Sequence, residues 1–266
     1  MTTRAMATRP LPVFMYHDIA DDPSAVEPSH RPYVLTPDAF ERQMSVLDRL
    51  RLRGVSLSAA LPGDGDSVVL TFDDGHASNA THALPILRAH GFTATFFVTA
   101  SWIGRAPYMT WDQIRSLSVA GMEIGTHSLT HRPPATLSPA ELDQELRESR
   151  RILEEGLGAP VVTGSAPTGF HNPRIGAAAR AAGYHALCVS RIGLWRPAAD
   201  PFAVPRVPVK MGTPLDLFER LARGDAAPLR ALRARQVMRN AVKRTLGVGP
   251  YLRLRRTLLG LKDRSR

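Results

Sequence analysis

Two short apolar segments of the chain each end in residues that can bind a metal ion. The first ends at the adjacent carboxylates Asp73 and Asp74, followed by a glycine, which is typical of a buried strand that runs into a polar loop. The second, about fifty residues later, leads to His127 and His131. Two carboxylates and two imidazoles at the ends of two strands could surround one divalent metal ion.

These residue types define the chemistry that such a site allows. One carboxylate and two neutral imidazoles make a three-ligand site with open positions, which suits Zn²⁺ and also Co²⁺, Ni²⁺ or Fe²⁺. A metal held in this way lowers the pKa of a bound water to about 7 and polarises a carbonyl oxygen. If both aspartates bound the metal, no base would remain to take a proton from that water. We therefore expect one of the two aspartates to act as the base.

The sequences Thr-Phe-Asp-Asp-Gly and His-Ser-x-x-His resemble the first two signature motifs of the polysaccharide deacetylases. These are metal-dependent carbohydrate esterases that contain the chitooligosaccharide-deacetylase homology domain. With weaker motifs included, the resemblance extends from about residue 11 to about residue 209. It implies that Asp74, His127 and His131 are the metal ligands and that Asp73 is the general base. The carbonyl attacked would then belong to an acetamide or an acetyl ester.

The third motif of that family is only partly present. The family has an arginine or an aromatic residue before Pro-Tyr-Gly, whereas this chain has Ser-Ala-Pro-Thr-Gly at 165–169. By resemblance, the backbone N–H of Thr168 would stabilise the oxyanion. The arginine that orients the base is absent, and Arg206 is the candidate replacement, with a solvated arginine as the alternative. His171 could line the site, although a loop histidine without a role is the simpler interpretation.

The late Leu-His motif that supplies the general acid in the family is absent after residue 190. In the exopolysaccharide branch of the family, whose strand order is permuted, a Tyr-His-Asp-Ile-like motif near the N-terminus takes its place. Residues 16–19 of this chain match that motif. We therefore expect His17 to be the general acid, with the neighbouring Asp18 orienting its ring and raising its pKa.

Segments typical of strands and helices alternate along the chain. Such alternation indicates parallel βαβ units, and candidate residues at several strand ends favour a barrel, whose loops converge on one face. The resemblance narrows this prediction to a distorted, incomplete (β/α) TIM-like barrel. Strands are expected at 11–16, 68–72, 93–99, 122–126, 161–164, 184–189 and 203–209, and helices at 37–53, 77–90, 111–120, 139–155 and 173–182.

The formal charge of +10 belongs to the C-terminal part of the chain. Residues 228–266 contain twelve Lys or Arg and one acid, which leaves residues 1–227 near −1. We therefore expect a barrel domain over 1–227 and a basic amphipathic tail over 228–266. Because these basic residues lie beyond the candidate site, no nucleic-acid partner is expected. The tail suits peripheral contact with an anionic membrane, and packing on the barrel as a solvated helix suits it equally.

The composition also bears on location. One cysteine, Cys188, excludes an internal disulfide and a cysteine-based zinc cage, and it is expected to be a small buried hydrophobe. The first ten residues lack an apolar core of signal-peptide length, and no stretch approaches eighteen apolar residues. We expect a cytoplasmic protein; the membrane alternative for the tail would place it at the inner face.

The sequence thus predicts a metal-dependent hydrolase that removes acetyl groups from N-acetylated or O-acetylated sugars of a polysaccharide, oligosaccharide or glycolipid precursor. Two alternatives stay open. The eroded third motif allows a catalytically inactive carbohydrate-binding barrel, and related folds hydrolyse small non-sugar amides. Packing is expected for Trp102, Trp111 and Trp195, with stacking on sugar rings as the alternative. Four histidines are expected to be structural or to face solvent, namely His76, His82, His90 and His185.

Overall fold

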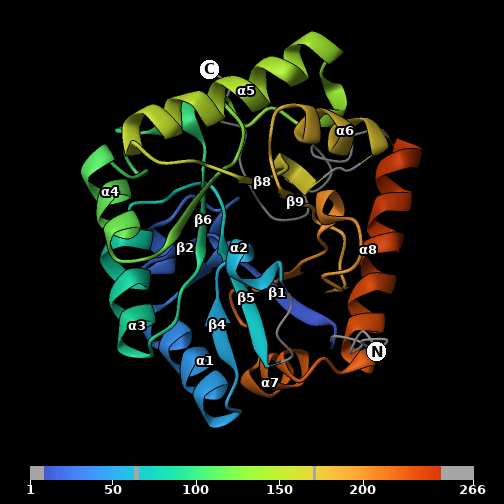
Figure 1. Cartoon of the computed structure of the whole chain (residues 1–266). Helices are drawn as coiled ribbons and strands as arrows, with labels where there is room; N and C mark the ends of the chain where they lie inside the picture. Colours follow the sequence, from blue (N-terminus) through green and yellow to red (C-terminus); the bar gives the residue numbers. More distant parts are fainter. Residues whose placement is uncertain (1–8, 63–65, 170–171, 247–266) are drawn as a thin grey trace, which may run out of the picture.

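A strongly curved sheet forms the centre of the molecule (Figure 1). The computed structural model describes residues 9–62, 66–169 and 172–246, with side chains as far as residue 238. Within these residues the sheet has nine strands, in the order β10-β1-β5-β6-β7-β8-β9, with β4 paired to β5 and β11 to β1. The strands are β1 (Leu11–Tyr16), β4 (Arg53–Val55), β5 (Ser67–Phe72), β6 (Thr95–Val98), β7 (Glu123–Thr126), β8 (Thr163–Ser165), β9 (Ala186–Cys188), β10 (Leu194–Trp195) and β11 (Val207–Pro208). All pairs are parallel except β1 with β10.

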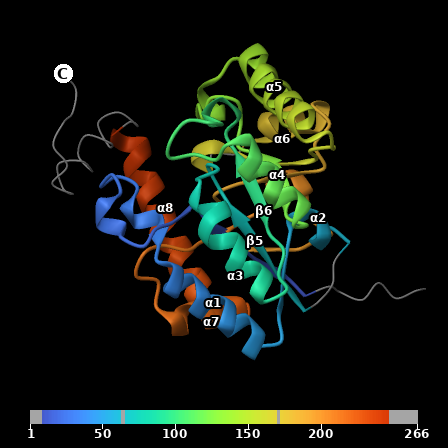
Figure 2. The same cartoon turned by 90° about the vertical axis from the view of Figure 1, so that its left-hand side faces the viewer.

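Helices surround the sheet on its outer side (Figure 2). They are α1 (Pro37–Arg49), α2 (Leu57–Ala60), α3 (Leu84–Ala89), α4 (Trp111–Val119), α5 (Pro139–Leu157), α6 (Pro173–Ala181), α7 (Leu215–Ala222) and α8 (Ala226–Leu246). A separate pair of short strands, β2 (Asp18–Ile19) and β3 (Val34–Leu35), lies next to the end of β1. The predicted distorted, incomplete (β/α) barrel is confirmed.

The expected strands are all present, although several are shorter than their apolar segments. Capping boxes begin α4 at Thr110 with Gln113 and α5 at Ser138 with Glu141. The segment expected as one helix over 77–90 instead begins as a wide π turn before α3. Pro85 lacks an N–H group and crowds the preceding turn, which explains this difference. The short elements β4, α2 and β10 and the helix α7 were not predicted.

The two faces of the sheet have different roles. Side chains of a strand alternate between faces, so Val13 and Val69 point into the barrel, where they pack with Cys188. Phe14 and Leu70, one residue further along, belong to the large cluster beneath the outer helices. The prediction that the cysteine is buried is therefore confirmed.

The short helix α2 covers the barrel at the amino-terminal ends of the strands. Glu123, the first residue of β7, accepts hydrogen bonds from the backbone N–H and the hydroxyl of Ser58 in α2. The same carboxylate accepts from Thr95 and Thr163 on the neighbouring strands. With this end filled, polar chemistry is left to the opposite end, where parallel strands of barrel enzymes carry their sites.

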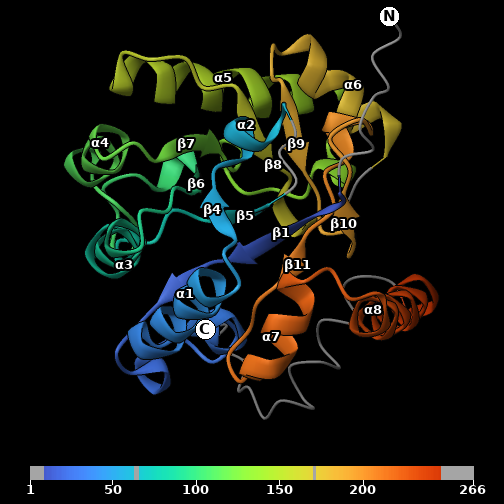
Figure 3. The same ribbon diagram turned by 60° about the horizontal axis from the view of Figure 1, so that its bottom comes forward.

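Residues 204–208 link the two sides of the curved sheet. Val204 forms a bridge with Cys188 at the end of β9, and three residues later Val207 pairs with Phe14 of β1. Figure 3 shows β11 beside β1 at this junction. Arg206 stands between these two contacts, so the segment that closes the barrel also delivers this side chain to its interior.

The first half of α8 packs on the barrel. Leu229 is buried in the main core and Leu232 packs against it. Gln236 donates a hydrogen bond to the carbonyl of Ser190 and accepts one from the N–H of Ile192. Leu229 and Leu232, two apolar residues of the basic tail, therefore face the protein. Those beyond residue 238 lie outside the described side chains.

The described helices include none with the length and apolar character needed to cross a bilayer.

Leu229→Ala should lower the free energy of unfolding by about 2–4 kcal/mol, because it removes buried methyl groups and leaves a cavity. Val237→Ala on the same helix should change it by less than about 0.5 kcal/mol, because Val237 is 68% exposed. Urea unfolding followed by circular dichroism measures both. Equal values for the two variants would contradict the packing of α8.

Candidate active site and metal centre

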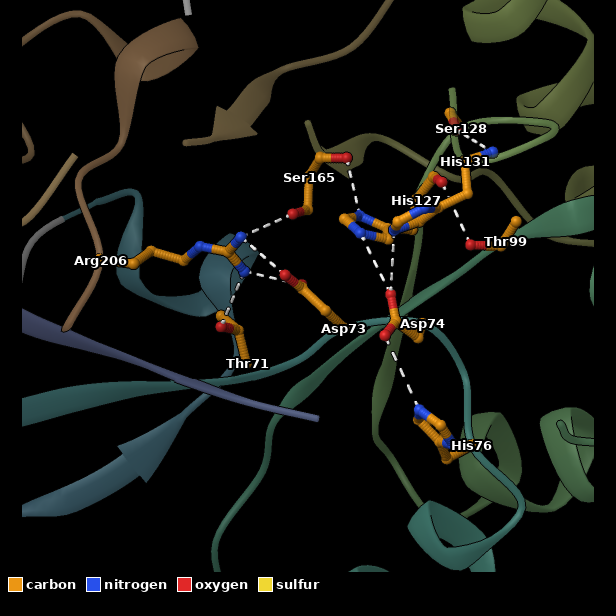
Figure 4. Close-up of polar contacts among 10 residues, drawn as sticks. All are labelled: Thr71, Asp73, Asp74, His76, Thr99, His127, Ser128, His131, Ser165 and Arg206. Atoms are coloured by element: carbon orange, nitrogen blue, oxygen red, sulfur yellow. Dashed lines mark hydrogen bonds and ion pairs between the residues drawn. The ribbon is translucent and has the colours of Figure 1, made fainter. Parts of the chain in front are cut away.

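The predicted site residues meet at the carboxyl-terminal edge of the sheet (Figure 4). Asp73 directly follows β5, and its N–H donates to the carbonyl of Tyr16 at the end of β1 (2.9 Å). His127 directly follows β7, and its N–H donates to the carbonyl of Val98 at the end of β6 (2.8 Å). The ladder thus continues one residue beyond the strands, which fixes where both side chains leave the backbone.

Asp74, His127 and His131 form a compact cluster. One ligand atom from each lies within 4.8 Å of the other two. The Nε2 atoms of His127 and His131 are each 3.4 Å from Oδ1 of Asp74. That oxygen is buried and has no hydrogen-bond partner among the described residues. A buried carboxylate oxygen is costly to leave unpaired, so the cluster suits a bound cation.

The hydrogen bond on the far side of His127 supports the same fit. Its Nδ1 lies 2.9 Å from the carbonyl oxygen of Ser165, which can only accept, so Nδ1 carries the proton. Burial lowers the pKa of His127 to about 4, against the charges of Asp73 and Asp74, which raise it. The ring is therefore neutral at pH 7, and Nε2 turns a lone pair toward Asp74. A divalent ion between these two acceptors resolves their repulsion.

The backbone around the cluster adopts conformations that are rare for residues other than glycine. Asp74, Ser128, His131 and Thr168 have φ angles of 75°, 63°, 61° and 58°. Among the described residues, one other non-glycine residue, Arg51, has a positive φ. Each such residue costs of order 1–3 kcal/mol and persists because its surroundings over-determine it. Their concentration here marks this edge as the functional end of the barrel.

Glu145 of α5 holds the loop that carries His131. Its Oε2 accepts hydrogen bonds from the N–H groups of Leu129 and Thr130, both at 2.9 Å, and its Oε1 accepts from the Thr130 hydroxyl. Within the loop, the N–H of His131 donates to the Ser128 hydroxyl. A buried carboxylate from a long helix therefore sets the direction of this candidate ligand. Nothing in the local sequence pointed to it.

Asp73 does not join the cluster but pairs with Arg206. The guanidinium donates to both carboxylate oxygens, Nη1 to Oδ1 at 2.7 Å and Nη2 to Oδ2 at 2.8 Å. Nη2 also donates to the Ser165 hydroxyl. Arg206 is only 1% exposed, so the alternative of a solvated arginine is wrong. Burial acts to raise the pKa of Asp73, but the charge of Arg206, aided by His127, holds that pKa below its usual range.

His17 lies at the same edge, but Asp18 does not orient its ring. Asp18 accepts a hydrogen bond from the Ser78 hydroxyl and has its second oxygen 3.8 Å from His76. The ring of His17 instead contacts Tyr33, with 4.8 Å between ring centroids, and its Nδ1 is buried without a partner in the described chain. The expected rise in the pKa of His17 is also wrong. Burial lowers that pKa, although the charges of Asp74 and Asp73 oppose it.

His76 belongs to the site, although the sequence analysis assigned it a structural role. Its Nε2 is 3.7 Å from Oδ2 of Asp74, and its ring contacts Tyr108. Burial acts to raise the pKa of Asp74, while the imidazoles of His131 and His76 hold it well below the usual range. The position of His76 two residues after Asp74 was the available signal, because the turn at Gly75 directs its ring back to the carboxylate.

The remaining candidate residues differ in whether they lie at the site. Trp102 stacks on His131 with 4.9 Å between ring centroids, so it borders the site. Trp195 is fully buried on the interior face and Trp111 packs against the core, which agrees with packing roles. Thr168 is exposed, three residues after Ser165, and His171 lies outside the described residues.

Comparisons with known proteins agree with this fold. Residues 60–187 match the family model described as Polysaccharide deacetylase. A Bacillus subtilis (strain 168) protein named "Putative polysaccharide deacetylase YxkH" is 26% identical over 209 residues, which cover 76% of this chain and 72% of that protein. A peptidoglycan-N-acetylglucosamine deacetylase of Bacillus cereus is 27% identical over 142 residues, 53% of this chain and 62% of that protein. The structure of IcaB from Ammonifex degensii is 26% identical with a TM-score of 0.69, covering 81% of this chain and 96% of that one.

A curled parallel barrel with carboxylates and imidazoles at the carboxyl ends of its strands is the arrangement of the barrel enzymes. Within that class, the chain contains a polysaccharide deacetylase domain, which the family model matches over residues 60–187. The family supports hydrolytic removal of acetyl groups from sugars.

Arg206→Met should lower the free energy of unfolding by about 3–5 kcal/mol, because it leaves the Asp73 carboxylate buried without its partner. The double variant Arg206→Met with Asp73→Asn should recover much of this loss, since no buried charge remains. Urea unfolding in the presence of a chelator measures both without a contribution from metal. A double variant no more stable than the single one would show that the pair is not the source of the effect.

Proposed function

We propose that this protein is a metal-dependent hydrolase that removes acetyl groups from N-acetylated or O-acetylated sugars. The observation that carries the proposal is the Asp74–His127–His131 cluster with the Asp73–Arg206 pair beside it. A catalytically inactive barrel would have no need to retain the carboxylates, the imidazoles and a buried arginine together. The name of the Bacillus cereus relative, a peptidoglycan-N-acetylglucosamine deacetylase, supports an acetylated amino sugar as the substrate.

The cluster would hold the metal through Oδ1 of Asp74 and the Nε2 atoms of His127 and His131. A divalent ion with this N₂O ligand set, of which Zn²⁺ is the first candidate, supplies an acidified water and polarises a carbonyl group. The protein fixes the direction of both rings. The Ser165 carbonyl holds Nδ1 of His127, and Glu145 holds the loop of His131.

Asp73 would act as the general base. A base must be ionised before the reaction, and the low pKa of Asp73 keeps the carboxylate charged at neutral pH. Arg206 contacts both oxygens, so it keeps the carboxylate in one orientation relative to the cluster. The backbone N–H of Thr168 would stabilise the oxyanion that forms as water attacks the acetyl carbon.

His17 would deliver the proton to the departing nitrogen. An amide nitrogen is a poor leaving group until it is protonated, so a donor is needed beside the base. Burial favours the neutral ring of His17, whereas the charges of Asp74 and Asp73 favour the protonated ring. The proton that Asp73 takes from water would pass to the His17 ring. His17 would then deliver it to the nitrogen as the carbon–nitrogen bond breaks.

Replacing His127 by Ala should abolish stoichiometric metal binding, because one of three protein ligands is lost. The protein should stay folded by circular dichroism. Elemental analysis after dialysis against Zn²⁺ measures the bound metal. His185→Ala is the matched control, since that histidine is exposed and should leave the metal content unchanged. Undiminished metal in the His127 variant would end the ligand assignment.

His17→Ala should retain its metal and yet lose about 10²–10⁴-fold in kcat on an amide substrate. An activated acetyl ester, whose leaving group needs no proton, should lose much less. Steady-state kinetics on both substrates with one enzyme preparation gives the comparison. If the amide and the ester fell equally, or neither fell, the general acid would have to be another residue, with His171 the next candidate.

A further inference from the structure

Lys210 stands at the mouth of the site next to His17. Strands β1 and β11 pair in parallel with Phe14 opposite Val207 and Met15 opposite Pro208, and the N–H of Val209 donates to the carbonyl of Met15. Continued by two more residues, this register sets Lys210 level with His17. Both side chains therefore leave the sheet at the edge that carries the catalytic cluster.

Tyr33 connects the two residues. Its ring centroid lies 4.8 Å from that of His17 and 5.1 Å from Nζ of Lys210, so the ammonium is at most about 10 Å from the His17 ring centre. The loop of Tyr33 is tied to the loop of Lys210, because the N–H of Met211 donates to the carbonyl of Pro32 (3.0 Å). The ammonium is thus held over an aromatic ring by a cation–π contact and a backbone bond.

Lys210 has no acidic partner in the part of the chain that the structure describes. Within the described residues no ion pair joins Lys210 to a carboxylate, whereas the nearby Arg220 pairs with Asp225 and Arg223 with Glu219. Lys210 is also the only lysine before residue 228, in a chain whose other cations there are arginines. A lysine ammonium is a compact charge with three donors that needs no fixed partner geometry. A lysine ammonium without an ion-pair partner at this position can bind an anionic group of a ligand.

We propose that Lys210, held against Tyr33, binds an anionic group on the sugar unit that adjoins the acetylated one. This inference rests on the proposed deacetylation and names its substrate class, an acetylated glycan that carries carboxylate or phosphate groups. Arg206 already pairs with Asp73, and a divalent ion would balance Asp74, so Lys210 is the cation at the rim that can pair with an anionic group of the substrate. Lys210 supplies that cation on the side of the leaving group, next to His17.

The test compares matched substrates on the full-length enzyme loaded with Zn²⁺. The acidic substrate is an oligosaccharide of N-acetylglucosamine alternating with glucuronic acid, and its carboxyl-reduced form is the neutral counterpart. An N-acetylglucosamine oligosaccharide with and without a terminal phosphate forms the second pair. Wild type should favour the anionic member of at least one pair by about three- to tenfold in kcat/KM, mainly through KM. The pair that shows the preference identifies the carboxylate or the phosphate as the group bound.

Lys210→Met should bring that ratio close to one, and Lys210→Arg should restore most of it. Arg88→Met, which removes an exposed arginine of α3, should leave the ratio unchanged. Wild-type ratios of one for both pairs, or a ratio that survives in Lys210→Met, would overturn the inference while leaving deacetylation supported by the acetate released. If no substrate released acetate, the proposed function would fail, and calorimetric binding of the same pairs to wild type and Lys210→Met would decide the anion site separately.

Discussion

The buried pair between Asp73 and Arg206 is the interaction on which the site depends. Two ions removed from water are stabilised only when their geometry is good and their remaining donors are satisfied. Here the contact is bidentate, and the guanidinium also reaches the Ser165 hydroxyl. The pair joins the end of β5 to the segment that closes the barrel between β9 and β1. The segment that closes the barrel therefore also orients Asp73, the proposed base.

The candidate metal-ligand cluster is also held by contacts with several parts of the fold. Ser165, at the end of β8, accepts hydrogen bonds from Arg206 through its hydroxyl and from Nδ1 of His127 through its carbonyl, so the proposed base and the proposed ligand share one support. Glu145 holds the neighbouring loop, and four residues around the cluster have positive φ angles. Such conformations persist only where hydrogen bonds on several sides hold them. The cluster is preorganised by its surroundings, which is what catalysis at a metal requires.

The rim of the site is made of elements other than the strand ends. Trp102 and Tyr108 stack beside His131 on one side, and Tyr33 with Lys210 lies beside His17 on the other. The helix α8 holds the loop of Ser190 and Ile192. Between these two residues, the carbonyl of Arg191 accepts a hydrogen bond from the backbone N–H of Arg206. The basic C-terminal segment, which composition sets apart from the rest of the chain, therefore begins as part of the barrel wall.

The sequence by itself determined the alternation of strands and helices, the barrel, and the meeting of the Asp73–Asp74 strand end with His127 and His131. These follow from local patterns, because apolar periodicity and polar strand ends are properties of adjacent residues. The sequence offered Arg206 as the arginine that orients Asp73, with a solvated arginine as the alternative, and the tertiary structure decided for the pair. Only the tertiary structure gave the orientation of Asp18 and the place of His76 and Glu145. Arg206 lies 133 residues from Asp73, and Glu145 acts from a helix on a loop, so no local pattern records either contact. Such pairings arise when closure of the barrel brings distant parts of the backbone together. A charge that is buried in this way is stable only if it is paired with an opposite charge.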